Sequence, residues 1–123
     1  MAVRLRILIV EDEWLIAEDL ADALRRAGHD VVASVPSVRE ALVIADRKTI
    51  DFALLDVQLN NETSYAIADS LTGKGVPFAF LTGYAEGSLP LRFSGVKMLQ
   101  KPVGNHLLLN ILPAVGEAGA PGL

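Results

Sequence analysis

Five short apolar runs alternate along the chain with segments in which apolar residues recur at helical spacing. Because these runs are mostly continuous rather than alternating, they predict strands that are buried on both faces. Helices between successive strands favour an α/β domain whose parallel sheet is covered on both sides. The predicted strands are Ile7 to Val10, Val31 to Ala33, Ile50 to Asp56, Pro77 to Leu81 and Val96 to Gln100.

The first two helices carry clear boundary signals. Between Ile16 and Ala27 the apolar residues lie on one face, with acidic residues early and arginines late, and Gly28 supplies the stop. Ser37 is placed to cap the second helix, and Glu40 at the third helical position completes a capping box. The pattern therefore predicts amphipathic helices after the first and second strands.

The later helices are less regular. Thr63 or Ser64 opens a third helix after a polar loop, and Asn105 to Val115 predicts a last helix that Pro113 shortens or bends. A helix is also due between the fourth and fifth strands, but glycine and proline interrupt residues 85–94. We expect this fourth helix to be short or poorly ordered.

Composition narrows the class of protein. A chain of 123 residues with 51% hydrophobic and 21% charged residues is typical of one globular domain, here predicted over residues 1–115 with a flexible tail at 116–123. The absence of cysteine excludes disulfides and thiol chemistry. A net charge of −4 argues against a nucleic-acid partner, and no apolar run is long enough to span a membrane. We expect a cytoplasmic protein.

Charged residues stand where three of the predicted strands end. Glu11 and Asp12 follow the first strand, Asp56 ends the third, and Lys101 follows the fifth. An unpaired charge is costly inside a sheet, so these side chains should lie at the strand tips. The carboxyl ends of neighbouring parallel strands meet at one edge, where a crevice forms. The sequence thus predicts one polar site at that edge.

Crowded carboxylates must either take up protons or share a cation. Glu11, Asp12 and Asp56 offer only oxygen ligands, which suits Mg²⁺, and the backbone carbonyl of Gln58 is a further candidate ligand. A cation held in this way leaves room for a phosphate oxygen.

A carboxylate is also a nucleophile toward phosphorus and forms an acyl phosphate. The groups that neutralise phosphoryl oxygens are a metal, an ammonium group and a hydroxyl. Lys101 supplies the ammonium and Thr82, at the end of the fourth strand, supplies the hydroxyl. Asp56 is the candidate phosphoryl acceptor.

Over residues 5–115 the chain resembles the receiver domain of bacterial two-component response regulators, the CheY-like family. The resemblance implies a flavodoxin-like sheet of order 2-1-3-4-5. It further implies Mg²⁺ at Glu11 and Asp12, phosphorylation of Asp56, phosphoryl contacts from Thr82 and Lys101, and a cis bond between Lys101 and Pro102.

The sequence departs from the family at several positions. The loop after Asp56 usually carries a proline and then a glycine, where this chain has Asn60 and Ser64. Three positions before the lysine, where the family carries an aromatic switch residue, this chain has Met98. The interval from Thr82 to Lys101 is shorter than is typical of the family.

Two further positions bear on dephosphorylation and on the subgroup. Gln58 and Tyr84 occupy the positions that tune dephosphorylation in receivers. For Tyr84, a purely structural role in packing is an equally weighted alternative. The run from Phe80 to Tyr84 resembles the Phe-x-Thr-Gly-Tyr (FATGUY) motif of an atypical subgroup, mostly alphaproteobacterial and often single-domain, that pairs with HWE or related histidine kinases.

These features predict a response regulator receiver that takes a phosphoryl group from a histidine kinase, not an enzyme beyond autophosphorylation and autodephosphorylation. Its output partner would be another protein, a phosphorelay component or a second copy of the chain in a homodimer. The alternative is a pseudo-receiver that serves as a constitutive protein-interaction module. An aspartyl phosphatase is disfavoured because Asp56-Val57-Gln58 lacks a second acid, and a flavodoxin because Glu11 to Glu13 would repel a flavin phosphate.

Overall fold

The computed structural model describes residues 4–83 and 89–113 of the chain. The larger strands are β1 (Arg6–Val10), β2 (Asp30–Val35), β3 (Phe52–Asp56), β6 (Phe78–Thr82) and β7 (Lys97–Gln100). The helices are α1 (Trp14–Arg26), α2 (Val38–Arg47), α3 (Tyr65–Gly73), the 3₁₀ helix η1 (Leu91–Phe93) and α4 (Asn105–Asn110).

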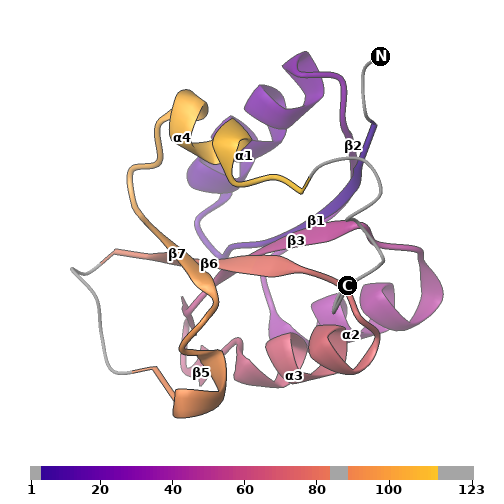
Figure 1. The fold of residues 1–123 in the computed structure, drawn as a ribbon, viewed down its shortest axis with the longest axis vertical. Helices are drawn as coiled ribbons and strands as arrows, with labels where there is room; N and C mark the ends of the chain where they lie inside the picture. The colour runs from indigo at the N-terminus through magenta and orange to yellow at the C-terminus, as the bar shows by residue number, and fades with distance from the viewer. Residues whose placement is uncertain (1–3, 84–88, 114–123) are drawn as a thin grey trace.

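The five larger strands form one parallel sheet in the order β2-β1-β3-β6-β7, which confirms the predicted order 2-1-3-4-5. Helices α1 and α4 cover one face of this sheet and α2 and α3 cover the other (Figure 1). Each face has its own core cluster, built on Leu24, Leu54 and Leu108 on the first side and on Leu55, Leu71 and Phe80 on the second. The predicted doubly wound α/β architecture is therefore confirmed.

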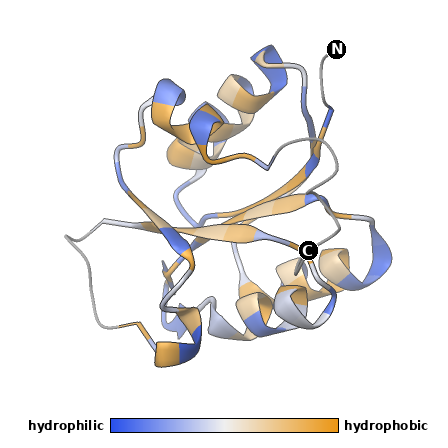
Figure 2. Ribbon diagram, in the orientation of Figure 1, coloured by the Kyte–Doolittle hydropathy of each residue, from blue (hydrophilic) through white to orange (hydrophobic). Residues whose placement is uncertain are grey.

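The central strands β1 and β3 are apolar because both of their faces are covered. Every residue from Ile7 to Val10 and from Phe52 to Leu55 is buried. Hydrophobic colouring accordingly dominates the strands, whereas hydrophilic colouring lies on outer turns of the helices (Figure 2). The continuous apolar runs in the sequence reflect this two-sided burial.

The signals for the first two helices are also found in the structure. Gly28 adopts a φ of 96° after α1, a conformation that glycine reaches without steric cost. Ser37 Oγ accepts a hydrogen bond from the backbone N–H of Glu40 at 3.3 Å, and the Ser37 hydroxyl donates to Glu40 Oε2 at 2.9 Å. The pair caps α2, although the Glu40 carboxylate accepts from the serine hydroxyl, not from its backbone.

His29, next to Gly28, is half-buried at the junction of α1 and β2. The backbone N–H of Leu5 donates a hydrogen bond to His29 Nδ1 at 3.1 Å. Burial lowers the pKa of His29 below its usual value of 6.5. The neutral ring is therefore part of the connection between α1 and the start of β1.

The polar segment after β3 is more regular than the predicted loop. Strands β4 (Gln58–Leu59) and β5 (Glu62–Thr63) form a small antiparallel hairpin. Leu59 is only 1% exposed and anchors this hairpin in the second core cluster. One buried apolar residue in a polar segment is too little periodicity to predict a hairpin.

Between β6 and β7 the described residues contain only the 3₁₀ turn η1, as expected for a short fourth helix. Arg92 of η1 makes two hydrogen bonds to Asp69 of α3, at 2.9 Å and 3.0 Å. The next residue, Phe93, packs its ring against Tyr65 and Phe80 at centroid distances of 5.5 Å and 5.4 Å. These contacts attach η1 to α3.

The last helix, α4, ends at Asn110, earlier than the predicted end at Val115. Pro113 cannot donate the backbone hydrogen bond that would continue the helix, which accounts for a stop ahead of it. The predicted tail at 116–123 lies outside the described residues. Within residues 4–83 and 89–113, no helix is both long enough and apolar enough to cross a membrane.

Candidate functional site

The predicted polar residues lie at one edge of the sheet, where the strands end. Glu11 directly follows β1, Asp56 is the last residue of β3, Thr82 ends β6, and Lys101 directly follows β7. The parallel register aligns these ends, because Val10 is opposite Leu55 and Asp56 is opposite Leu81. The backbone N–H of Lys101 donates to the carbonyl oxygen of Thr82 at 2.7 Å.

Three carboxyl groups converge at this edge. Glu11, Asp12 and Asp56 each place a carboxylate oxygen within 4.8 Å of the others. Glu11 and Asp56 are only 2% and 5% exposed, whereas Asp12 is half-buried. An all-oxygen set of this size fits Mg²⁺, which is usually held by one or two carboxylates and keeps several waters.

The ammonium group of Lys101 lies among the acids. Its Nζ is 3.0 Å from Glu11 Oε1, 3.2 Å from Asp56 Oδ2 and 3.6 Å from Glu13 Oε1. Glu13 was not among the predicted site residues. Its position directly after the acid pair is the signal that could have indicated this contact, because the first residue before a helix stays close to the end of the preceding strand.

Burial and charge shift the protonation of these groups. Desolvation raises the pKa of Glu11 to about 7, although hydrogen bonds from the Glu13 backbone and Lys101 oppose the rise. Desolvation also raises the pKa of Asp56, with Lys101 opposing it. Partial burial alone would lower the pKa of Lys101, but hydrogen bonds to Glu11 and Asp56 outweigh it and raise that pKa. Without a bound cation, the two buried acids therefore hold protons up to a higher pH than exposed carboxyl groups do.

Of the other predicted site residues, Gln58 lies next to Asp56, whereas Met98 lies in the core. The backbone N–H of Gln58 donates a long hydrogen bond of 3.4 Å to Asp56 Oδ1, while the Gln58 side chain is exposed. Met98 is half-buried within β7, opposite Phe80, and packs against the second core cluster. Tyr84 lies outside the described residues. The peptide bond between Lys101 and Pro102 is cis, as the family resemblance implies.

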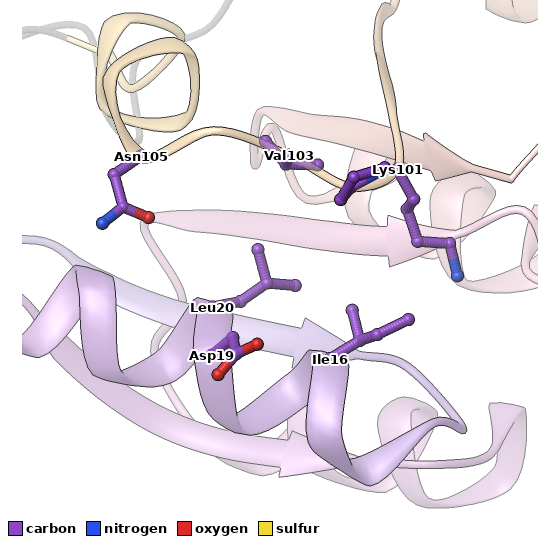
Figure 3. Close-up of a pocket in the computed structure, with 7 residues that line it drawn as sticks. Ile16, Asp19, Leu20, Lys101, Val103 and Asn105 are labelled. Carbon is purple, nitrogen blue, oxygen red and sulfur yellow. The ribbon is translucent and has the colours of Figure 1, made fainter.

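A pocket of about 290 Å³ opens beside Lys101, between α1 and the segment that joins β7 to α4. Ile16 and Leu20 of α1 point across it toward Val103, and Asp19 and Asn105 lie at its polar rim (Figure 3). The site at the strand ends is thus bordered on the α1 side by an apolar hollow.

The comparisons with known proteins agree with this geometry. The family model of the response regulator receiver domain matches residues 7–112. The chain is 29% identical over 115 residues to the transcriptional regulatory protein PdtaR of Mycobacterium tuberculosis, covering 93% of this chain and 56% of that protein. It is 40% identical over 83 residues to the phyllosphere-induced regulator PhyR of Methylorubrum extorquens, covering 65% of this chain and 31% of that protein.

Among solved structures, the solution structure of SdrG from Sphingomonas melonis Fr1 matches with a TM-score of 0.79 and 38% identity, covering 89% of this chain and 94% of SdrG. The chain spans only about half of PdtaR and about a third of PhyR. Receiver domains are generally non-enzymatic signalling domains that bind Mg²⁺ through acidic residues and work with histidine kinases and downstream proteins. The chain belongs to the response regulator receiver domain family of two-component signalling.

Proposed function

We propose that the chain is a phosphorylation-dependent switch in which Asp56 accepts a phosphoryl group from a histidine kinase. The observation that carries the proposal is the contact of 3.2 Å between Lys101 Nζ and Asp56 Oδ2 beside two further acids at the strand ends. A carboxylate next to one fixed cation and a set of metal-binding oxygens has the surroundings that phosphoryl transfer requires.

In the proposed reaction, an Asp56 carboxylate oxygen attacks the phosphorus of a phosphohistidine. The P–N bond breaks, the imidazole leaves with the electron pair and takes up a proton, and Asp56 becomes an acyl phosphate. Glu11, Asp12, Asp56 and the Gln58 carbonyl would hold Mg²⁺, whose charge offsets that of the phosphoryl oxygens. Lys101 and Thr82 would contact the remaining phosphoryl oxygens.

Phosphorylation would be read through Thr82 and the segment that follows it. Thr82 is buried at the end of β6, and η1 is attached to α3 through Arg92 and Phe93. We propose that this region carries the change to a protein-binding surface, with Gln58 and Tyr84 tuning dephosphorylation. The output is another protein, a phosphorelay partner or a second copy of the chain.

Within the receiver family, we propose that the chain belongs to the Phe-x-Thr-Gly-Tyr subgroup. Its partner kinase would then be of the HWE or a related type. Phe80, Leu81, Thr82 and Gly83 carry the described part of this motif. The likeness to SdrG and PhyR is compatible with the assignment.

A non-switching pseudo-receiver is the second candidate. It is favoured by Met98, which stands in the position of the aromatic switch residue and packs against the core. It is also favoured by the small size of η1. In this case the chain would bind its partner equally well with and without phosphorylation.

Intact-mass measurement after incubation with acetyl phosphate and Mg²⁺ tests the proposal. We expect the mass to increase by one phosphoryl group, and we expect no increase without Mg²⁺ or in the Asp56→Asn variant. Asp19→Asn, a change to an exposed aspartate of α1, is the matched control and should leave the adduct intact.

Fluorescence of Trp14 provides a second measurement in the same samples. Trp14 is 70% exposed and follows Glu13, so its emission should respond to Mg²⁺ and to beryllofluoride. No phosphoryl adduct together with no response to beryllofluoride would rule out the switch and leave the interaction module.

A further inference from the structure

The backbone of the β4–β5 hairpin holds the Asp12 side chain. The N–H of Asn60 donates a hydrogen bond of 3.2 Å to Asp12 Oδ2. Asn60 is also the one non-glycine residue with a positive φ, 51°, among residues 4–83 and 89–113. Asparagine tolerates this left-handed conformation better than most residues. The conformation of residue 60 and the contact with Asp12 therefore belong to the same turn.

The same hairpin also contacts Asp56. Gln58, its first residue, directs a backbone N–H toward Asp56 Oδ1 at 3.4 Å. The hairpin is closed at its base by the N–H of Ser64, which donates to the Val57 carbonyl oxygen at 3.0 Å. Leu59, between Gln58 and Asn60, is buried in the core. One short, anchored segment thus contacts two of the three clustered carboxylates.

We infer that Asn60 is a positioning residue for the cation site: its left-handed backbone aims an N–H at Asp12 and holds that carboxylate beside Asp56 and Glu11. This inference rests on the proposed function, because it concerns the Mg²⁺ that the acids are proposed to hold. Asn60 is uncharged and is not one of the proposed Mg²⁺ ligands, so it acts on the site only through Asp12.

The hydrogen bond uses Asp12 Oδ2 and leaves Asp12 Oδ1 free of this contact. A carboxylate fixed by an outer hydrogen bond presents its other oxygen in one orientation, and loss of such outer contacts typically weakens metal binding by about 10- to 100-fold. Without this bond, Asp12 would rotate freely about its side-chain torsions, because it is only half-buried. Cation binding would then have to order it.

Proline is the informative substitution at this position. It has no backbone N–H and its φ is restricted to about −65°, so Asn60→Pro removes both the donor and the left-handed turn. Asn60→Gly keeps the N–H and reaches positive φ readily. Asn60→Val keeps the N–H but disfavours positive φ. Asn61→Val is the matched control, since Asn61 is the neighbouring turn residue and has no positive φ.

The test measures Mg²⁺ affinity by Trp14 fluorescence and Mn²⁺ affinity by electron paramagnetic resonance, with melting temperatures in EDTA as the measure of folding. We expect Asn60→Pro to bind both ions at least about tenfold more weakly than the wild type. Asn60→Gly and Asn61→Val should stay within about twofold of it. If Asn60→Pro does not fold, Asn60→Val decides the matter: we expect a several-fold loss of Mg²⁺ and Mn²⁺ affinity in a protein that still unfolds cooperatively in EDTA, at a lower melting temperature because valine disfavours positive φ.

The test distinguishes a failure of the positioning role of Asn60 from a failure of the proposed cation site. Wild-type affinity in folded Asn60→Pro, or in Asn60→Val where the proline variant does not fold, would overturn the role of Asn60 and leave the proposed function intact. Failure of the wild type to bind Mg²⁺ or Mn²⁺ at all would overturn the proposed cation site and the positioning role together.

Discussion

Burial of Glu11 should make the metal-free protein less stable as the pH rises. Desolvation raises the pKa of Glu11 from 4.5 to about 7, so between these values the folded protein binds a proton that the unfolded chain has released. The contribution of Glu11 to the free energy of unfolding is then greatest below pH 4.5, and it falls as the pH rises through 7. At 1.36 kcal/mol per pKa unit, about 2 to 3 kcal/mol should be lost between pH 5 and pH 8.

Urea unfolding followed by circular dichroism in EDTA, at pH 5 and pH 8, measures this loss. The Glu11→Gln variant has no titrating group at residue 11 and should lose about 2 to 3 kcal/mol less than the wild type over the same interval. The raised pKa of Asp56 acts in the same direction in the wild type, and the lowered pKa of His29 acts in the opposite direction in both proteins. The comparison between the two proteins therefore measures Glu11 together with its effect on the pKa of Asp56.

Glu18→Gln, which changes an exposed glutamate of α1, is the matched control and should follow the wild type at both pH values. Equal losses in the wild type and Glu11→Gln, or a larger loss in the variant, would refute the argument from burial. Saturating Mg²⁺ at pH 8 should restore stability to the wild type, because a bound cation replaces the proton.

Three further changes test other contacts by urea unfolding. Lys101→Met removes the ammonium group from between Glu11 and Asp56 and should lower the free energy of unfolding by about 3 kcal/mol at pH 8. The loss should be smaller at pH 5, where the acids take up protons. An equal loss at both pH values would contradict this. Lowering the pH below about 6.5 should destabilise the wild type, because protonation of His29 removes the acceptor for the Leu5 N–H. The His29→Phe variant should lack this part of the pH dependence. Ser64→Ala should stabilise the protein by about 1 kcal/mol, because Ser64 Oγ is buried without a hydrogen-bond partner among the described residues; a loss of stability would indicate a partner.

The placement of the candidate site residues at the strand ends was predictable because of how a parallel sheet is built. Asp56 and Thr82 end apolar strands, and Glu11 and Lys101 directly follow them. A charged residue directly after a buried run can only lie at the edge. Strand order then brings those edges together.

Contacts made across the loops were not predictable. Glu13 lies 3.6 Å from Lys101, and Asn60 contacts Asp12, yet neither residue stands at the end of one of the five parallel strands. In both cases the contact depends on packing between segments that are distant in the sequence. The early end of the last helix was indicated by Pro113, although the residue at which it ends, Asn110, was not.

The sequence by itself determined the alternation of strands and helices, the two-sided burial of the central strands and the placement of acids and lysine at one edge. These follow from local periodicity and from the cost of burying charge. Only the tertiary structure decided that Leu59 anchors a hairpin, that this hairpin turns Asn60 toward Asp12, and that Lys101 lies among three carboxylates. Such contacts arise when separate crossovers pack on the same sheet, and no local pattern encodes their distances.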